Sequence, residues 1–227
     1  MKKTLISIKL LLVCCITLFI TGTVSAQLSV GQRYYFGNYD QGNGKSQISW
    51  IVIKIEGNKA LLLSEKILDE KPYHDNYVDE IKWENCSLRK WLNNDFYNTA
   101  FSSSEKSRIV EVVNKNPATS GTDSNYGFYH YVEGGKDTKD KVFLLSIDEA
   151  KDFYKKIGAW RCYYTEKVAR MGGYAADVEF GPVWWLRSPG ISENCAAMVY
   201  SQGILDNCFE PVWVITIGVR PAIWITF

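Results

Sequence analysis

The sequence predicts an α+β domain built mainly from antiparallel β-sheet with a few short helices. Short runs of aromatic, β-branched and aliphatic residues fill the N-terminal third and the segment after position 183. The central part instead carries apolar residues at helical spacing. Because strands are followed by helices and then by strands again, without a regular βαβ alternation, we expect an antiparallel sheet rather than a parallel one.

The first 26 residues have the pattern of an export signal. A basic start precedes an apolar run from Leu5 to Ile20, and Val24-Ser25-Ala26 offers small residues at a cleavage site. We therefore expect residues 1–26 to be a Sec-type bacterial signal peptide and residues 27–227 to form a single domain, secreted or held in the cell envelope. No later segment approaches the roughly 20 apolar residues of a membrane span, so none is expected after cleavage.

The N-terminal third is expected to form three strands. They are Gln32–Phe36, Ile48–Glu56 and Lys59–Glu65, and the Gly57-Asn58 pair predicts a tight hairpin turn between the last two. The stretch Gly37–Gln47 is rich in Gly, Asn and Asp, which predicts a surface loop.

The centre is expected to be helical. Residues 86–100 place apolar side chains at helical spacing, with Asn85 or Ser87 as the N-cap. Ser102 with Glu105, and Ser146 with Glu149, have the spacing of capping boxes that open two further helices. A fourth helix is expected over Thr165–Met171, ended by the glycines that follow.

Residues 114–140 lose this periodicity, which predicts a long loop, and long loops inside compact domains are often functional. Tyr126, Tyr129 and Tyr131 lie there among polar turn residues. On an extended segment they would face one side and form a strip able to stack on a sugar or grip a peptide. The alternative is that these rings fold back and pack onto the body of the domain.

Two related motifs close the chain, WWLRSPG at 184–190 and GVRPAIWI at 218–225. Each combines an apolar run with one arginine and one proline, which predicts buried strands of the central sheet. Trp184 and Trp185 are expected to be structural. Arg187 and Arg220 should each meet a carboxylate, backbone carbonyls or water, because an isolated buried guanidinium is costly.

Four cysteines follow the leader, an even number that permits disulfides in an exported protein. Two strands are expected around Ser201-Gln202-Gly203, and this hairpin would bring Cys195 close to Cys208. Cys86 and Cys162 either form a second bridge or remain buried thiols.

Charge and motif content argue against several classes of function. Removal of the three leader lysines from the formal charge of +1 leaves about −2, without a dense basic patch, so no nucleic acid is expected as a partner. The two histidines lie in different segments and no CxxC pair exists, so neither a metal site nor a cofactor is expected. Calcium stays open as an alternative through Asp206-Asn207 or Glu210.

No catalytic constellation stands out either. GxSxG is absent, and neither histidine has the context of a general base. The acidic pairs Asp69-Glu70 and Asp79-Glu80 are interpreted as solvated surface rather than as the two carboxylates of a glycosidase.

Several long segments in this order resemble the bacterial DUF6273 domain family, and together they cover nearly all of the chain after the leader. They are Val30–Tyr39, Ile48–Asp69, Trp83–Ile109, Asp140–Ala150 and the two closing motifs. The ending is similar to that of domains with a C-type lectin-like architecture, including formylglycine-generating enzymes, so the resemblance implies that fold. The calcium-binding triplets of sugar-binding lectins are missing, since Glu210-Pro211 is followed by Val212 and Trp83 by Glu84-Asn85.

The sequence therefore favours an exported, non-catalytic recognition module whose partner is an extracellular glycan or protein. The alternative is an enzyme, either on a scaffold like that of the formylglycine-generating enzymes or as a carboxylate-dependent hydrolase. Fold analogy alone is a weak reason for either activity.

Overall fold

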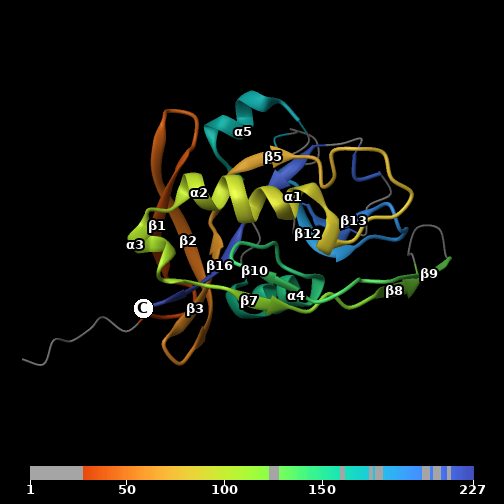
Figure 1. Ribbon diagram of the computed structural model, residues 1–227, viewed down its shortest axis with the longest axis horizontal. Helices are drawn as coiled ribbons and strands as arrows, with labels where there is room; N and C mark the ends of the chain where they lie inside the picture. Colours follow the sequence, from red (N-terminus) through yellow and green to blue (C-terminus); the bar gives the residue numbers. More distant parts are fainter. Residues whose placement is uncertain are drawn as a thin grey trace, which may run out of the picture.

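The computed structural model describes residues 28–122, 128–158, 162–173, 176, 181–200, 205–206 (backbone only), 211–213 and 216–227. The expected signal peptide, Tyr126 and Cys208 lie outside these residues. Figure 1 shows two main sheets side by side, crossed in front by a helical run, with a β-hairpin extending to the right. The expected α+β class with mainly antiparallel sheets is confirmed.

The first sheet has five strands in the order β1-β2-β3-β16-β6, and every pair in it is antiparallel. Its strands are β1 (Arg33–Asp40), β2 (Lys45–Glu56), β3 (Lys59–Ser64), β16 (Ala222–Thr226) and β6 (Ile109–Val110). Glu56 pairs with Lys59 across the turn at Gly57-Asn58, so the predicted hairpin is confirmed.

The predicted loop over residues 37–47 is mostly strand. β1 continues through a bulge between Tyr35 and Asn38, and only residues 41–44 connect it to β2. Gly37 has φ 73° there, a conformation that favours glycine, and its N–H donates to Glu105 Oε1 at 2.8 Å. Glycine thus allows the strand to bend and continue.

The second sheet has the order β14-β13-β12-β15-β5, with β12 and β15 parallel and its other pairs antiparallel. Its strands are β14 (Leu205–Asp206), β13 (Ala196–Val199), β12 (Trp184–Pro189), β15 (Ile217–Val219) and β5 (Asp69–Lys71). The closing motifs therefore do not share one central sheet as expected. The chain passes from β15 in the second sheet to β16 in the first through Arg220-Pro221.

The two closing motifs pack directly on each other. Trp184 pairs with Gly218, whose N–H donates to the Val183 carbonyl at 3.1 Å. A Cβ at Gly218 would lie 2.5 Å from that carbonyl oxygen, so a side chain there would force the strands apart. The Arg220 guanidinium lies 5.0 Å from the centre of the Trp184 ring, and its Nε donates to the Ser64 carbonyl at 2.9 Å.

The buried Arg187 guanidinium meets a carboxylate and a backbone carbonyl, while its Nε has no partner among the described residues. Its guanidinium donates to the Leu144 carbonyl at 2.7 Å and forms an ion pair with Glu149. Trp184 and Trp185 are fully buried, and Trp185 Nε1 donates to the Lys71 carbonyl at 2.9 Å. These side chains therefore lie buried in β12, the strand formed by the first closing motif.

The helical run over residues 87–100 consists of α1 (Ser87–Trp91), a π-helical turn η2 (Leu92–Phe96) and α2 (Tyr97–Ala100). Neither Asn85 nor Ser87 is its N-cap. Cys86 takes that position, and its sulfur accepts a hydrogen bond from the Arg89 N–H at 3.4 Å. The buried apolar side chains of the run are Leu88, Leu92, Phe96 and Ala100.

The other predicted helices are present with their predicted caps. They are α3 (Ser103–Lys106), α4 (Ile147–Ile157) and α5 (Glu166–Met171), and the 3-10 turn η1 covers Trp83–Asn85. Both capping boxes form, and Gly172 ends α5 in the left-handed conformation.

Three two-stranded sheets complete the described part of the chain. The strand β4 (Lys66–Ile67) pairs in parallel with β11 (Tyr163–Tyr164), β7 (Val112–Asn114) pairs with β10 (Thr138–Asp140), and β8 (Thr119–Thr122) pairs with β9 (Tyr129–Val132). The predicted loop over residues 114–140 therefore contains the strands β8, β9 and β10.

Candidate functional site

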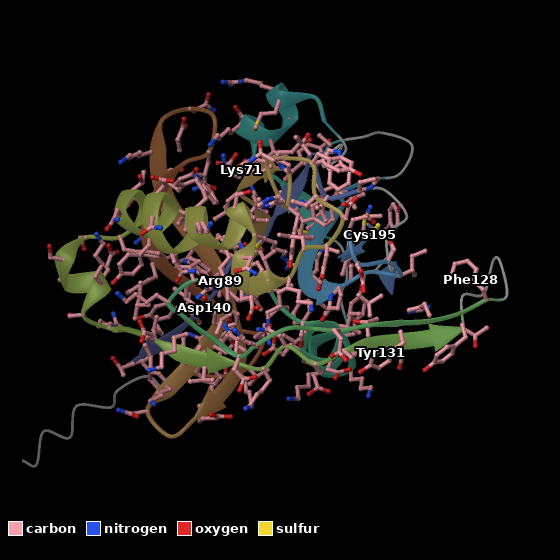
Figure 2. The ribbon with its side chains drawn as sticks, turned by 45° about the vertical axis from the view of Figure 1, so that its right-hand side comes forward. Lys71, Arg89, Phe128, Tyr131, Asp140 and Cys195 are labelled. Atoms are coloured by element: carbon pink, nitrogen blue, oxygen red, sulfur yellow. The ribbon has the colours of Figure 1, made fainter. Side chains whose placement is uncertain are left out.

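The hairpin of β8 and β9, here called the arm, has two different faces. Thr119 pairs with Val132, Ser120 with Tyr131, Gly121 with His130 and Thr122 with Tyr129. Since side chains alternate along a strand, Tyr129 and Tyr131 share the outer face with Ser120 and Thr122. Figure 2 shows the arm with Tyr131 and Phe128 at the right of the molecule.

The outer face is exposed and the inner face is buried. Tyr129 and Tyr131 keep 68% and 58% of their surface accessible, whereas His130 and Val132 between and beside them are buried. Tyr129 and Tyr131 therefore do not fold back onto the body of the domain, which was the alternative expectation. A pair of large exposed rings on one face is a feature of binding surfaces.

The hydroxyl of Tyr131 acts as a hydrogen-bond donor. It donates to Glu133 Oε1 at 3.0 Å, and this hydrogen bond to a carboxylate raises the pKa of Tyr131 above its ordinary value. Tyr131 thus stays neutral at physiological pH and offers a ring face together with a polar end.

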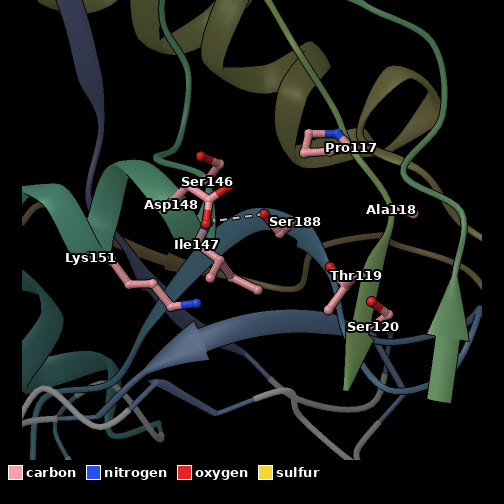
Figure 3. Close-up of a pocket in the computed structure, with 9 residues that line it drawn as sticks. All are labelled: Pro117, Ala118, Thr119, Ser120, Ser146, Ile147, Asp148, Lys151 and Ser188. Atoms are coloured by element: carbon pink, nitrogen blue, oxygen red, sulfur yellow. Dashed lines mark hydrogen bonds between the residues drawn. The ribbon is translucent and has the colours of Figure 1, made fainter. Parts of the chain in front are cut away.

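A cavity of about 300 Å³ lies at the base of the arm (Figure 3). One wall is the chain from Pro117 to Ser120, and the opposite wall is the start of α4 with Ser188 of β12. Ser120 belongs both to this wall and to the outer face of the arm. The aromatic face and the cavity are therefore continuous and form one candidate binding surface.

Ser146 and Ser188 of this cavity have structural roles and are not arranged as catalytic nucleophiles. Ser188 Oγ accepts a hydrogen bond from the Ile147 N–H at 3.0 Å, and Ser146 Oγ accepts one from the Glu149 N–H at 3.2 Å. Both hydroxyls thus occupy the first amide groups of α4. The charged groups of the cavity are Asp148 and Lys151, both exposed. The arrangement suits binding through hydrogen bonds and charge.

The interpretation of Asp69-Glu70 as solvated surface is wrong. Both carboxylates are buried. Asp69 Oδ2 accepts from Tyr39 Oη at 2.5 Å and pairs with Lys167 at 2.7 Å, while Glu70 Oε1 accepts from Thr216 Oγ1 at 2.8 Å. The acids therefore join β5 to its neighbours. Asp79-Glu80 is exposed as expected.

The cysteines that the structure describes form no disulfide with one another. Cys86 and Cys162 are buried free thiols, so the expectation of a buried thiol applies to both. Cys195 is buried, and its expected partner Cys208 lies outside the described residues.

Within the described ranges, no group of three or more His, Cys, Asp and Glu side chains could hold a metal ion. Asn207 and Glu210, considered for calcium, lie outside these ranges, as does the side chain of Asp206. His74 Nδ1 accepts the Ser87 N–H at 3.2 Å at the start of α1.

Sequence patterns did not reveal the cavity. Its residues are spread over three segments that meet only in the folded chain, and none of them forms a motif. Sequence patterns also did not reveal a second cavity of about 310 Å³, which lies beside Trp91. There Lys71 Nζ lies 4.6 Å from the centre of the indole ring, and Asp75 and Asp95 are among the lining residues.

These features define an α+β domain with a polar cavity and an exposed aromatic face. The chain belongs to the DUF6273 family, described as a domain of unknown function, whose profile matches residues 57–227. The match begins at the turn between β2 and β3, so β1 and β2 precede it. No curated protein and no solved structure matches the chain. None of the helices among the described residues is long and apolar enough to span a bilayer.

Proposed function

We propose that this protein is an exported, non-catalytic recognition module that binds an extracellular glycan or protein along the outer face of the arm and in the adjoining cavity. The observation that carries the proposal is the exposure of Tyr129 and Tyr131 on one face, continuous through Ser120 with the cavity. Exposed aromatic anchors beside polar groups are the usual composition of a recognition surface.

The chemistry of the surface supports this proposal. Tyrosine offers a large ring with few rotatable bonds, so little conformational entropy is lost when a ligand stacks on it. The cavity volume of about 300 Å³ lies at the lower end of the usual range for ligand sites. Asp148, Lys151 and the hydroxyls of β8 can orient a polar ligand.

Export and the finer architecture are part of the same proposal. The apolar leader with its small-residue site supports cleavage after Ala26 and a secreted or envelope location. The closing GVRPAIWI motif supports a C-type lectin-like architecture. N-terminal sequencing of the protein recovered from an expressing bacterial culture tests export, and a mature chain that retained residues 1–26 would contradict it.

The catalytic alternative has less support. Cys195 is buried, and Asp69 and Glu70 are buried in contacts between structural elements. A formylglycine-generating or carboxylate-dependent activity would instead need a reactive thiol or a pair of accessible carboxylates.

Binding by the purified domain to glycan and peptide arrays tests the proposed function. In the Tyr129→Ala/Tyr131→Ala variant, affinity for any ligand found should fall by about tenfold or more, because hot-spot aromatics each contribute about 1.4 kcal/mol or more. Its free energy of unfolding should change by less than about 0.5 kcal/mol, as for other exposed residues.

Tyr35→Ala is the matched control. Tyr35 lies on β1 and has 57% of its surface exposed, close to the value for Tyr131, yet it is not part of the arm. The control should bind as the unchanged protein does. Absence of binding on both arrays, or equal binding by the arm variant, would overturn the proposal.

A further inference from the structure

We infer that the ligand is an extended polypeptide segment, added as a third strand along the free edge of β8. This inference rests on the proposed recognition function and selects protein over glycan as the ligand class. Addition of a peptide strand to an exposed sheet edge is a recurring mode of recognition, in which backbone hydrogen bonds supply affinity and alternate side chains supply specificity.

The first observation is the state of the β8 edge. Within the described part of the chain, β8 pairs with β9 on one side and with no strand on the other. Because alternate residues of an antiparallel strand turn their N–H and C=O groups away from the partner, this edge carries unpaired donors and acceptors. A two-stranded sheet is also only marginally stable by itself, so a third strand would stabilise it.

The second observation is how the cavity meets β8. It is lined by four consecutive residues, Pro117 to Ser120, and β9 contributes no lining residue. Thr119 and Ser120 are the first two residues of β8, and consecutive side chains of a strand point to opposite faces, so a cavity lined by both lies along the edge of the strand. Figure 3 shows β8 as the strand of the arm next to the cavity.

The third observation is the composition of the opposite wall. Ile147 offers a half-buried apolar side chain, and Asp148 and Lys151 offer one charge of each sign. A strand bound in the cavity would direct alternate side chains toward this wall. Pro117 has no N–H to donate, so the edge able to pair begins at Ala118.

A glycan would be held differently. Sugar rings would stack on Tyr129 and Tyr131 and would leave the backbone groups at the β8 edge without partners. A polypeptide can pair with the free backbone groups of the β8 edge, because the N–H and C=O groups of the polypeptide repeat at the spacing of the strand.

The experiment uses a phage-displayed library of random linear peptides, with a glycan array run in parallel on the same protein. Selected peptides are then synthesised in normal form and with alternate backbone nitrogens methylated. We expect methylation in one of the two alternating sets to reduce affinity by about tenfold or more, because it removes the donors that face β8. In the isotope-labelled protein, amide exchange at residues 118–122 should slow when the peptide binds.

A pair of proline variants tests the edge from the protein side. Adjacent residues direct their N–H groups to opposite edges, so one of Ser120→Pro and Gly121→Pro removes a donor to β9 and the other removes a donor at the free edge. The variant that keeps the β8–β9 ladder, as shown by its backbone nuclear Overhauser effects, should lose peptide binding by about tenfold or more.

The outcomes separate the inference from the proposed function. Binding of glycans alone, or of peptides without effect on the β8 edge, would overturn strand addition and leave the recognition function in place. Lack of binding to either library would overturn both. Self-association of the protein through β8, seen as a dimer whose β8 amides are protected without peptide, would replace the polypeptide ligand by a second copy.

Discussion

Glu149 joins the start of α4 to β12 through Arg187. Its Oε2 atom accepts a hydrogen bond from the Ser146 N–H at 2.8 Å, which closes the capping box. The same atom accepts a second hydrogen bond from the Arg187 guanidinium. The Arg187 side chain is almost completely buried, whereas 35% of the Glu149 side chain is exposed. The same carboxylate therefore caps a helix and balances a buried charge.

Replacement of Glu149 by Ala should lower the free energy of unfolding by about 3 kcal/mol. This is the lower end of the range for breaking a buried ion pair, because Glu149 is partly exposed. Urea denaturation measures the loss. Arg187→Met in the same chain should restore part of it, because no unpaired buried charge remains; a double variant less stable than Glu149→Ala would contradict this account.

Trp185→Ala should lower the free energy of unfolding by about 3 to 5 kcal/mol, the usual cost of truncating a large buried aromatic side chain. Trp185 is fully buried, contacts the Tyr73 ring edge-on at 5.6 Å and donates to the Lys71 carbonyl. Thermal and urea unfolding provide the measurement, with Tyr35→Ala as the exposed control. A loss below about 1 kcal/mol would show that the β12 environment is not closely packed.

Stability should fall in acid through Glu105. Burial alone would raise the pKa of its carboxyl, but hydrogen bonds from Ser102 and from the Gly37 N–H outweigh burial and hold that pKa below the ordinary 4.5. The folded state therefore binds fewer protons than the unfolded state in this acid range. The stabilisation that the Glu105 carboxylate provides is fully present above the unfolded pKa and is lost as the pH falls through the folded pKa.

Urea denaturation across this acid range, with Glu105→Gln as the comparison, measures the effect. The stability difference between the two proteins should be largest near neutral pH and should shrink as the pH falls below 4.5. A difference that did not change with pH would exclude Glu105 as an origin of acid sensitivity.

The thiols of Cys86 and Cys162 should resist alkylation in the folded protein. Burial raises the pKa of Cys86 to about 12 and raises that of Cys162 as well, so neither is a thiolate at mildly alkaline pH. Mass spectrometry after iodoacetamide treatment should find both unmodified in buffer and both modified in denaturant. Rapid modification of either in the folded state would contradict its burial.

The sequence predicted the elements that are specified locally. The turn at Gly57-Asn58 and both capping boxes depend on residues at most three positions apart, so their patterns can be read along the chain. The β8 strand was missed because Thr-Ser-Gly-Thr has no apolar alternation, and its register comes from pairing with Tyr129–Val132.

The candidate site was predicted only in part. Tyr129 and Tyr131 were recognisable as aromatic residues in a polar segment, and the alternation of an extended chain places them on one face. The cavity depends on long-range contacts among the segment before β8, α4 and Ser188, which no local pattern encodes. The buried state of Asp69 likewise depends on Lys167, distant in sequence, which supplies the compensating charge.

The placement of β15 and β16 has a consequence for the order of folding. β15 lies between β12 and β5, and β16 lies between β3 and β6, so neither five-stranded sheet is continuous until both strands are present. Both pair with strands from much earlier in the chain, β15 with β5 and β16 with β3. Completion of the core therefore depends on contacts of large sequence separation, which makes folding slow.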